Sequence, residues 1–142
     1  MFEQPRIAQE FDDVSYEALH EGQTFTSTYE VSRELVRVYN GLVGQPDPPE
    51  PSQTAPPWVY CTFLPLYRAL AGRMQQGSVH TRQKVDHVTA TRIGEVLDVE
   101  VRVTAKFERD GKRHVVFESL FYGTGHDLRC RVETALLWGY SA

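Results

Sequence analysis

The sequence predicts an α+β domain in which a long antiparallel sheet wraps around one apolar helix. Most of the chain beyond residue 77 alternates between apolar and polar residues, which is typical of half-buried strands. The segment Pro57–Ala71 carries one charged residue, Arg68, and a helix that is apolar on nearly every side is buried on nearly every side. The apolar face of the sheet needs a cover, and this helix is the element apolar enough to provide it.

A strand and a short helix are expected before the apolar helix. Thr24–Val31 alternates, with aromatic and β-branched residues, and therefore predicts a half-buried strand. Ser32 is expected to cap the helix that follows, and Gly44 is expected to end it. The apolar residues of this helix recur at the spacing of one helical face: Leu35, Val38, Tyr39, Leu42 and Val43.

Proline dominates the next segment, residues 44–57, which holds six of the eight prolines of the chain. Proline fixes φ and removes a hydrogen-bond donor, so this segment is neither a helix nor a central strand. Neither flank is long enough to form an independent domain, so we interpret the segment as a rigid loop inside one domain that spans residues 1–142. Within the apolar helix, Pro65 is expected to cause a kink or a break.

Four alternating segments follow the apolar helix. The first runs from Ser78 to Ile93, and the last from Leu128 to Tyr140. Lys112–Tyr122 is apolar on both faces and is therefore expected to be a central strand, joined to its predecessor by a hairpin turn at Asp110-Gly111. The residues expected on the buried face of that predecessor are Leu97, Val99, Val101, Val103, Ala105 and Phe107.

The composition disfavours several classes of function. The net charge is -4 and the Lys and Arg residues form no basic block, which argues against nucleic acid or an anionic membrane as a partner. No apolar run reaches the roughly 18 residues of a membrane span. Cys61 and Cys130 lack the spacing of a metal site, so we expect two reduced cysteines in a cytoplasmic protein. No HxxxH or HExxH spacing occurs, and neither a metal nor another cofactor is expected.

Three short motifs carry a resemblance to a known family. Gly-Gln-Pro-Asp-Pro stands at residues 44–48, Ala-Pro-Pro-Trp at residues 55–58 and Val-His-Thr-Arg-Gln at residues 79–83. With this order of elements they resemble the hot-dog fold, and within it the MaoC-like hydratase/dehydratase group, most of all the N-terminal half of two-part dehydratases. The resemblance implies an acyl thioester of CoA or of a carrier protein as substrate. It also implies a homodimer, or a heterodimer with another hot-dog subunit.

The loop at residues 44–50 departs from the pattern of the active members of this group. Those members have Gly-Asp-x-Asn-Pro-x-His, in which the Asp and the His act as a general acid/base pair. Here Gln45 stands at the Asp position, Glu50 at the His position and Asp47 at the Asn position. Glu50 could act as a base if burial raises the pKa of its carboxyl group, with Asp47 in the second role. The alternative is a solvated loop without chemistry.

The start of the apolar helix is where the resemblance places the thioester, because backbone N–H groups at a helix N-terminus can bind its oxygen. Pro56 and Pro57 lack an N–H, so Trp58 and Val59 would have to donate. Gln45 and Ala55 complete the expected substrate-binding residues.

His80 is the third catalytic candidate, beside Asp47 and Glu50. It opens the strand that follows the apolar helix, but the alternation places it on the charged face with Arg82 and Lys84, which also fits an exposed structural histidine. His87 falls on the opposite face and is expected to be a half-buried core residue.

Three functions remain open from the sequence. The first is an acyl-thioester hydratase or dehydratase with a non-standard catalytic loop. The second is a non-catalytic hot-dog subunit that binds the acyl chain or pairs with an active MaoC-like partner. The third, a thioesterase, is disfavoured because several thioesterase families with this fold place a carboxylate on the central helix, and Trp58–Ala71 contains none. Cys61 as a nucleophile is disfavoured because its apolar surroundings would raise its pKa.

Overall fold

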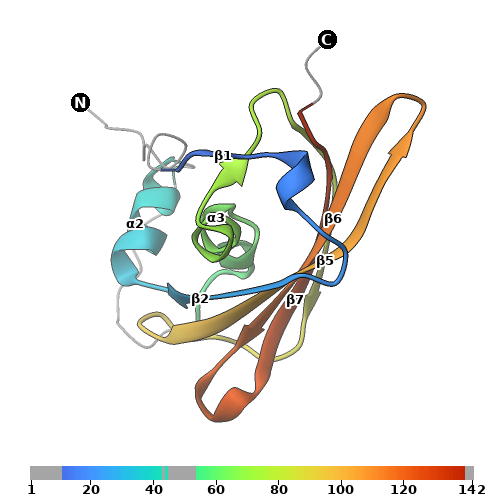
Figure 1. Ribbon diagram of the computed structural model, residues 1–142. Coiled ribbons are helices and arrows are strands. Elements are labelled where there is room, and N and C mark those ends of the chain that lie inside the picture. Colours follow the sequence, from blue (N-terminus) through green and yellow to red (C-terminus); the bar gives the residue numbers. More distant parts are fainter. Residues whose placement is uncertain (1–10, 43, 45–53, 140–142) are drawn as a thin grey trace.

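The computed structural model describes residues 11–42, 44 and 54–139. A five-stranded antiparallel sheet curves around the helical segment between residues 57 and 70 (Figure 1). The α+β architecture predicted from the sequence is therefore confirmed. In spatial order the strands are β2 (Thr24–Glu30), β5 (Val96–Arg109), β6 (Lys112–Tyr122), β7 (Leu128–Leu137) and β4 (Val79–His87).

Strand β6 is central, as its apolar residues on both faces predicted. It pairs with β5 on one side and with β7 on the other. Strands β2 and β4 lie at the two edges: within the described part of the chain, β2 pairs only with β5 and β4 only with β7. Strand β4 ends at His87 rather than at Ile93, and the chain then leaves the sheet in a connection to β5.

Helix α2 (Arg33–Leu42) follows β2 and begins as the sequence predicts. The backbone N–H of Leu35 donates to the side-chain oxygen of Ser32 over 3.0 Å, which is the contact of a helix cap. Val36 is the fully buried residue of this helix. Gly44 has a φ of 74°, a left-handed conformation that suits glycine beyond a helix end.

The central helical segment is not one continuous helix, which confirms the kink or break expected from Pro65. A 3-10 turn, η2 (Pro57–Tyr60), is followed by a break and then by helix α3 (Leu64–Leu70). Pro65 explains the break, because its ring would clash with the carbonyl of Cys61 in a continuous α-helix. In the first turn of α3 the missing N–H of proline has no cost, and there Pro65 is buried.

The hydrophobic core lies between the sheet and these two helical pieces. Val59 of η2 has no exposed surface, and its carbonyl oxygen accepts a hydrogen bond from the hydroxyl of Tyr29 over 2.8 Å. The rings of Tyr60 and Phe121 meet edge to face with centroids 5.2 Å apart. Burial raises the pKa of Tyr29 to about 12, so its hydroxyl stays protonated and remains a donor at neutral pH.

A β-bulge in β5 reverses the faces of its last residues. The pairing with β6 shifts between Val103 and Ala105, so one extra residue stands on the β5 side. Phe107, expected on the buried face, instead stacks on His114 at 4.6 Å and is 37% exposed. Lys106 turns the other way, and its ammonium group donates to the carbonyl of Leu19 over 2.7 Å.

The N-terminal part of the described chain passes beside α3 (Figure 1). Strand β1 (Asp13–Val14) pairs in parallel with β3 (Arg73–Met74), and η1 (Tyr16–Ala18) leads on to β2. The indole N–H of Trp138 donates to the carbonyl of Val14 over 2.8 Å. Between β6 and β7 lies a further 3-10 turn, η3 (Thr124–His126). No described helix is long and apolar enough to cross a membrane.

Candidate functional site

A pocket of about 230 Å³ lies where the start of η2 meets the connection between β4 and β5. We call it the helix-start pocket. Its walls come from two short stretches of chain that are far apart in the sequence, residues 54–60 and 87–91. The residues that line it are Thr54, Ala55, Pro57, Tyr60, His87, Val88, Thr89, Ala90 and Thr91.

Thr91 joins the two walls of the helix-start pocket. Its carbonyl oxygen accepts a hydrogen bond from the backbone N–H of Ala55 over 2.6 Å. Its side-chain oxygen accepts one from the hydroxyl of Tyr60 over 2.5 Å. Thr91 is 1% exposed, so both hydrogen bonds are shielded from water. The start of η2 is therefore fixed to the β4–β5 connection at two points.

His87 makes a third link between the same two stretches. Its Nε2 lies 3.1 Å from the carbonyl oxygen of Pro57. A carbonyl oxygen only accepts, so Nε2 is the donor, and in the neutral ring Nδ1 is then an acceptor. The ring also meets that of Tyr60 edge to face, with centroids 5.5 Å apart. His87 is exposed and not half-buried as expected, because β4 is an edge strand that ends at this residue.

Arg129 of β7 holds the β4–β5 connection in place. Its side chain is 11% exposed and ion-pairs with Glu95 at 3.0 Å and with Asp127 at 2.7 Å. The guanidinium also donates to the carbonyl of Ala90 over 3.1 Å. The carboxylates of Glu95 and Asp127 raise the pKa of Arg129, and hydrogen bonding from Arg129 lowers the pKa of Glu95. The wall of the pocket thus rests on a partly buried charge network.

The residues expected to bind the thioester divide into two groups. Gln45, with the catalytic candidates Asp47 and Glu50, lies outside the described residues, and these assignments stay predictions. Ala55 is buried and lines the helix-start pocket. These observations do not test its role.

Trp58 and Val59 were expected to donate their N–H groups to the thioester oxygen. The N–H of Val59 already donates to the carbonyl of Pro56 over 3.2 Å. Trp58 is half-buried, and its ring packs on that of Tyr39 at 5.0 Å. Of the two proposed donors, the N–H of Val59 is engaged inside the turn, which leaves Trp58 as the stronger candidate. Both assignments stay predictions.

His80 lies at the opposite end of β4 from the helix-start pocket. It is exposed, its Nε2 lies 3.1 Å from the carbonyl oxygen of Arg82, and its ring meets that of Phe63 at 5.2 Å. Among residues 11–42, 44 and 54–139, no histidine nitrogen lies within 4.0 Å of a carboxylate oxygen of another residue in this range. The described residues therefore do not form a histidine–carboxylate pair.

Sequence reasoning missed His87, Tyr60 and Thr91 as residues that surround one pocket. The run His-Val-Thr-Ala-Thr at residues 87–91 keeps the alternation of polar and apolar residues, so it was assigned to a longer strand. The alternation gave no sign that β4 ends at His87.

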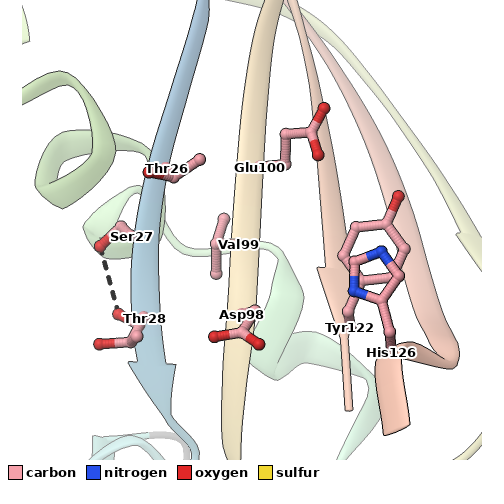
Figure 2. Close-up of a pocket in the computed structure, with 8 residues that line it drawn as sticks. All are labelled: Thr26, Ser27, Thr28, Asp98, Val99, Glu100, Tyr122 and His126. Atoms are coloured by element: carbon pink, nitrogen blue, oxygen red, sulfur yellow. Dashed lines mark hydrogen bonds between the residues drawn. The ribbon is translucent and has the colours of Figure 1, made fainter. Parts of the chain in front are cut away.

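A second cavity, of about 610 Å³, lies on the face of the sheet that points away from the helices. We call it the outer-face cavity. Figure 2 shows the carboxylates of Asp98 and Glu100 on β5 and the overlapping rings of Tyr122 and His126, which stack at 4.1 Å. The residues that line it are Thr26, Ser27, Thr28, Asp98, Val99, Glu100, Tyr122 and His126.

The described part of the chain offers little support for a cysteine nucleophile or a metal site. Both cysteines are free. Burial raises the pKa of Cys61, and it raises that of Cys130 to about 12, so neither is a ready nucleophile at neutral pH. Among the described residues, no group of three His, Cys, Asp or Glu side chains could hold a metal ion.

Comparison with known proteins decides the fold. No protein-family model matches the sequence, and no curated protein matches it. Among solved structures, the HadBC complex (3R-hydroxyacyl-ACP dehydratase) of Mycobacterium tuberculosis contains a chain that is 20% identical with a TM-score of 0.67, over 82% of this chain and 96% of that one. The R-hydratase PhaJ1 of Pseudomonas aeruginosa is 14% identical with a TM-score of 0.71, over 91% and 88%.

A MaoC-like dehydratase of Rhodospirillum rubrum is 18% identical with a TM-score of 0.63, over 89% of this chain and 97% of that one. The chain has the hot-dog fold. This confirms the expectation that the sequence motifs raised about its architecture. Together, η2 and α3 correspond to the central helix of the hot-dog fold. The helix-start pocket lies at the N-terminal end of this helix, beside the edge strand β4.

Proposed function

We propose that this chain is a MaoC-like subunit of an acyl-thioester hydratase or dehydratase, and that a partner subunit provides the acid/base pair. The arrangement of its histidines carries the proposal. The loop at residues 44–50 contains no histidine, and the described histidines have no carboxylate partner among the described residues. His80 and His87 stand at opposite ends of β4, and each contacts a backbone carbonyl.

The proposed substrate is an acyl thioester of CoA or of a carrier protein. Water adds across the double bond of an enoyl thioester: its oxygen bonds to the β-carbon while the α-carbon gains a proton. One group must activate the water and another must handle the α-carbon proton. In this proposal the partner supplies both groups, and this chain binds and orients the thioester. Similarity of fold to a hydratase and two dehydratases supports this class of substrate.

The proposed partner is another hot-dog subunit that pairs along β4. Within the described part of the chain, one edge of β4 carries backbone groups without a strand partner, and an open strand edge is a template for pairing. Seven of its nine residues are exposed. The M. tuberculosis protein named above is itself a complex, which supports a partner of the same fold.

A second candidate is an enzyme that needs no different partner. Glu50 at the position of the family histidine favours it, because a carboxyl group whose pKa is raised by burial can act as a general base. In that case Asp47 and His80 would complete the site. The chain would then work as a homodimer, with the same class of thioester.

Hydration of crotonyl-CoA and of longer enoyl-CoAs, followed by loss of absorbance of the conjugated thioester, tests the two candidates. We expect no turnover from the purified chain alone, and turnover when a subunit with the Asp/His loop co-purifies with it. A stable, active homodimer would rule out the partner-dependent form. If its activity fell in the Glu50→Ala variant, the second candidate would be supported.

A further inference from the structure

The hairpin formed by β5 and β6 extends beyond both neighbouring strands of the sheet (Figure 1, orange). The pairing of β5 with β2 ends at Arg102, and the pairing of β6 with β7 ends at His114. From there the two strands of the hairpin continue to pair with each other as far as Arg109 and Lys112. The tip of the hairpin therefore presents its side chains outside the body of the sheet.

Two cross-strand pairs form one face of this tip. Phe107 lies opposite His114, and Arg109 lies opposite Lys112. Residues directly opposite each other, and residues two apart along a strand, share a face of a sheet. We call these four residues the hairpin platform. Three of them are exposed and His114 is half-buried, so an exposed surface combines aromatic and cationic side chains and holds no carboxylate.

Arg109 is the group of the hairpin platform that is best placed to bind a ligand. Its guanidinium lies over the ring of Phe107, 5.3 Å from the centroid, and His114 stacks on the same ring at 4.6 Å. Within the described ranges of the chain, no carboxylate oxygen lies within 4.0 Å of this guanidinium, and Asp110 beside it belongs to the turn. A guanidinium restrained by stacking can bind a carboxylate through two parallel hydrogen bonds with little loss of side-chain freedom.

The opposite face of the hairpin is packed against the rest of the protein. The ammonium group of Lys106 lies over the ring of Tyr16, 4.2 Å from its centroid. Arg113 lies over the same ring and is 3.7 Å from a carboxylate oxygen of Glu17 and 3.8 Å from one of Glu108. The cations of this face therefore have partners, and their contacts hold the hairpin in place. The outward face is left as a fixed surface for another molecule.

We propose that the hairpin platform docks a short acidic segment of a partner protein. A carboxylate of the segment binds Arg109, and an apolar side chain beside it covers the exposed part of the Phe107 ring. Arginine and aromatic residues are enriched at the centres of protein interfaces. A nucleic acid or an anionic membrane would need a broader basic surface than this platform and would be repelled by the net charge of -4.

The inference goes beyond the proposed function and does not depend on it. Strand β7 lies between β6 and β4, so a segment on the hairpin platform leaves the open edge of β4 free for the partner subunit proposed above.

Titration of the full chain with a defined acidic peptide tests the proposal. The probe is a peptide of four glutamates and two leucines, blocked at both ends, and the control peptide has glutamine in place of each glutamate. Backbone amide shifts in NMR spectra report binding. The variants are Arg109→Gln and Phe107→Leu. The matched control is Arg102→Gln, which removes the same charge from another exposed position of β5. All three positions are exposed, so the variants should fold, and circular dichroism checks this.

We expect the acidic peptide to shift the amides of residues 106–114, and the glutamine peptide to bind roughly tenfold more weakly or worse. Arg109→Gln should weaken binding of the acidic peptide roughly fivefold or more and Phe107→Leu severalfold, whereas Arg102→Gln should stay within about twofold. The proposal is overturned if Arg109→Gln and Arg102→Gln bind alike, if both peptides bind equally, or if millimolar acidic peptide shifts no amide of the tip.

Two further outcomes would identify a different occupant and would also overturn the proposal. The first is a dimer, seen by light scattering without peptide, that Arg109→Gln dissociates, because the platform would then dock a second copy of this chain. The second is a short DNA duplex that binds at the tip more tightly than the acidic peptide does.

Discussion

The helix-start pocket and the outer-face cavity lie on opposite sides of one sheet and are built in different ways. The first is the smaller, about 230 Å³ against about 610 Å³. Its walls are joined by the hydrogen bonds of Thr91 and His87 and supported by the Arg129 network. The second is lined by side chains of a water-facing sheet surface, and the one hydrogen bond drawn among them joins the neighbours Ser27 and Thr28 (Figure 2).

The comparison teaches that the volume of a pocket does not indicate how its walls are held together. The outer-face cavity is a hollow between the strands of the sheet and His126 of η3. Such a hollow needs no dedicated contacts to exist. The helix-start pocket exists because the hydrogen bonds of Thr91 hold the start of η2 and the β4–β5 connection together, and buried polar groups are costly unless they are satisfied.

The largest expected difference is in the free energy of unfolding, between a variant beside the helix-start pocket and one on the outer face of the sheet. Both variants replace an arginine of β7. Arg129→Met should lower the free energy of unfolding by about 3 kcal/mol, because it leaves the partly buried carboxylate of Glu95 without its cation. Arg131→Met should cost less than about 1 kcal/mol, because Arg131 pairs with Glu118 on the outer face and is 46% exposed. Urea unfolding of both variants measures the difference, and equal costs would break the comparison.

A smaller difference in stability is expected between two tyrosine variants, one beside each pocket. Tyr60→Phe removes the hydroxyl that donates to buried Thr91 and should cost about 1–2 kcal/mol. Tyr122→Phe, on the outer face, should change stability by less than about 0.5 kcal/mol. Thermal unfolding of both variants gives the result. A stability loss in Tyr122→Phe as large as that in Tyr60→Phe would show that the outer-face cavity is also held by its hydroxyl.

The smallest expected effect is a dependence on pH. Hydrogen bonding from Arg129 lowers the pKa of Glu95 below its ordinary value of 4.5. A carboxyl group with a lowered folded pKa stabilises the protein above its unfolded pKa, and this contribution is lost as the pH falls through the folded value. Stability should therefore fall as the pH drops below about 4.5. Glu95→Gln should make that fall shallower, as measured by urea unfolding across this pH range; an unchanged slope in Glu95→Gln would contradict the role of Glu95.

The sequence predicted the architecture because its signals are local. Alternation placed the strands, the side chain of Ser32 marked the start of α2, and apolar residues on both faces placed Lys112–Tyr122 at the centre. The bulge near Val103 was not predictable, because it depends on the register between two strands and leaves the alternation of each intact. The exposure of Phe107 follows from that register.

The candidate site was harder to predict than the fold. Asp47 and Glu50 were assigned by position in a loop pattern, and they stay predictions. His87 was missed because its role depends on where β4 ends and on the carbonyl of Pro57, which is 30 residues away in the chain. Contacts of this kind come from the tertiary structure and leave little trace in periodicity.

Backbone amide shifts of the isotope-labelled chain during titration with crotonyl-CoA test the central claim most directly. The account predicts the largest shifts at Ala55, Trp58 and residues 87–91, which surround or adjoin the helix-start pocket. Residues 26–28, 98–100 and 122–126, around the outer-face cavity, should shift little. Shifts concentrated at the outer-face cavity, or none at saturating crotonyl-CoA, would contradict it.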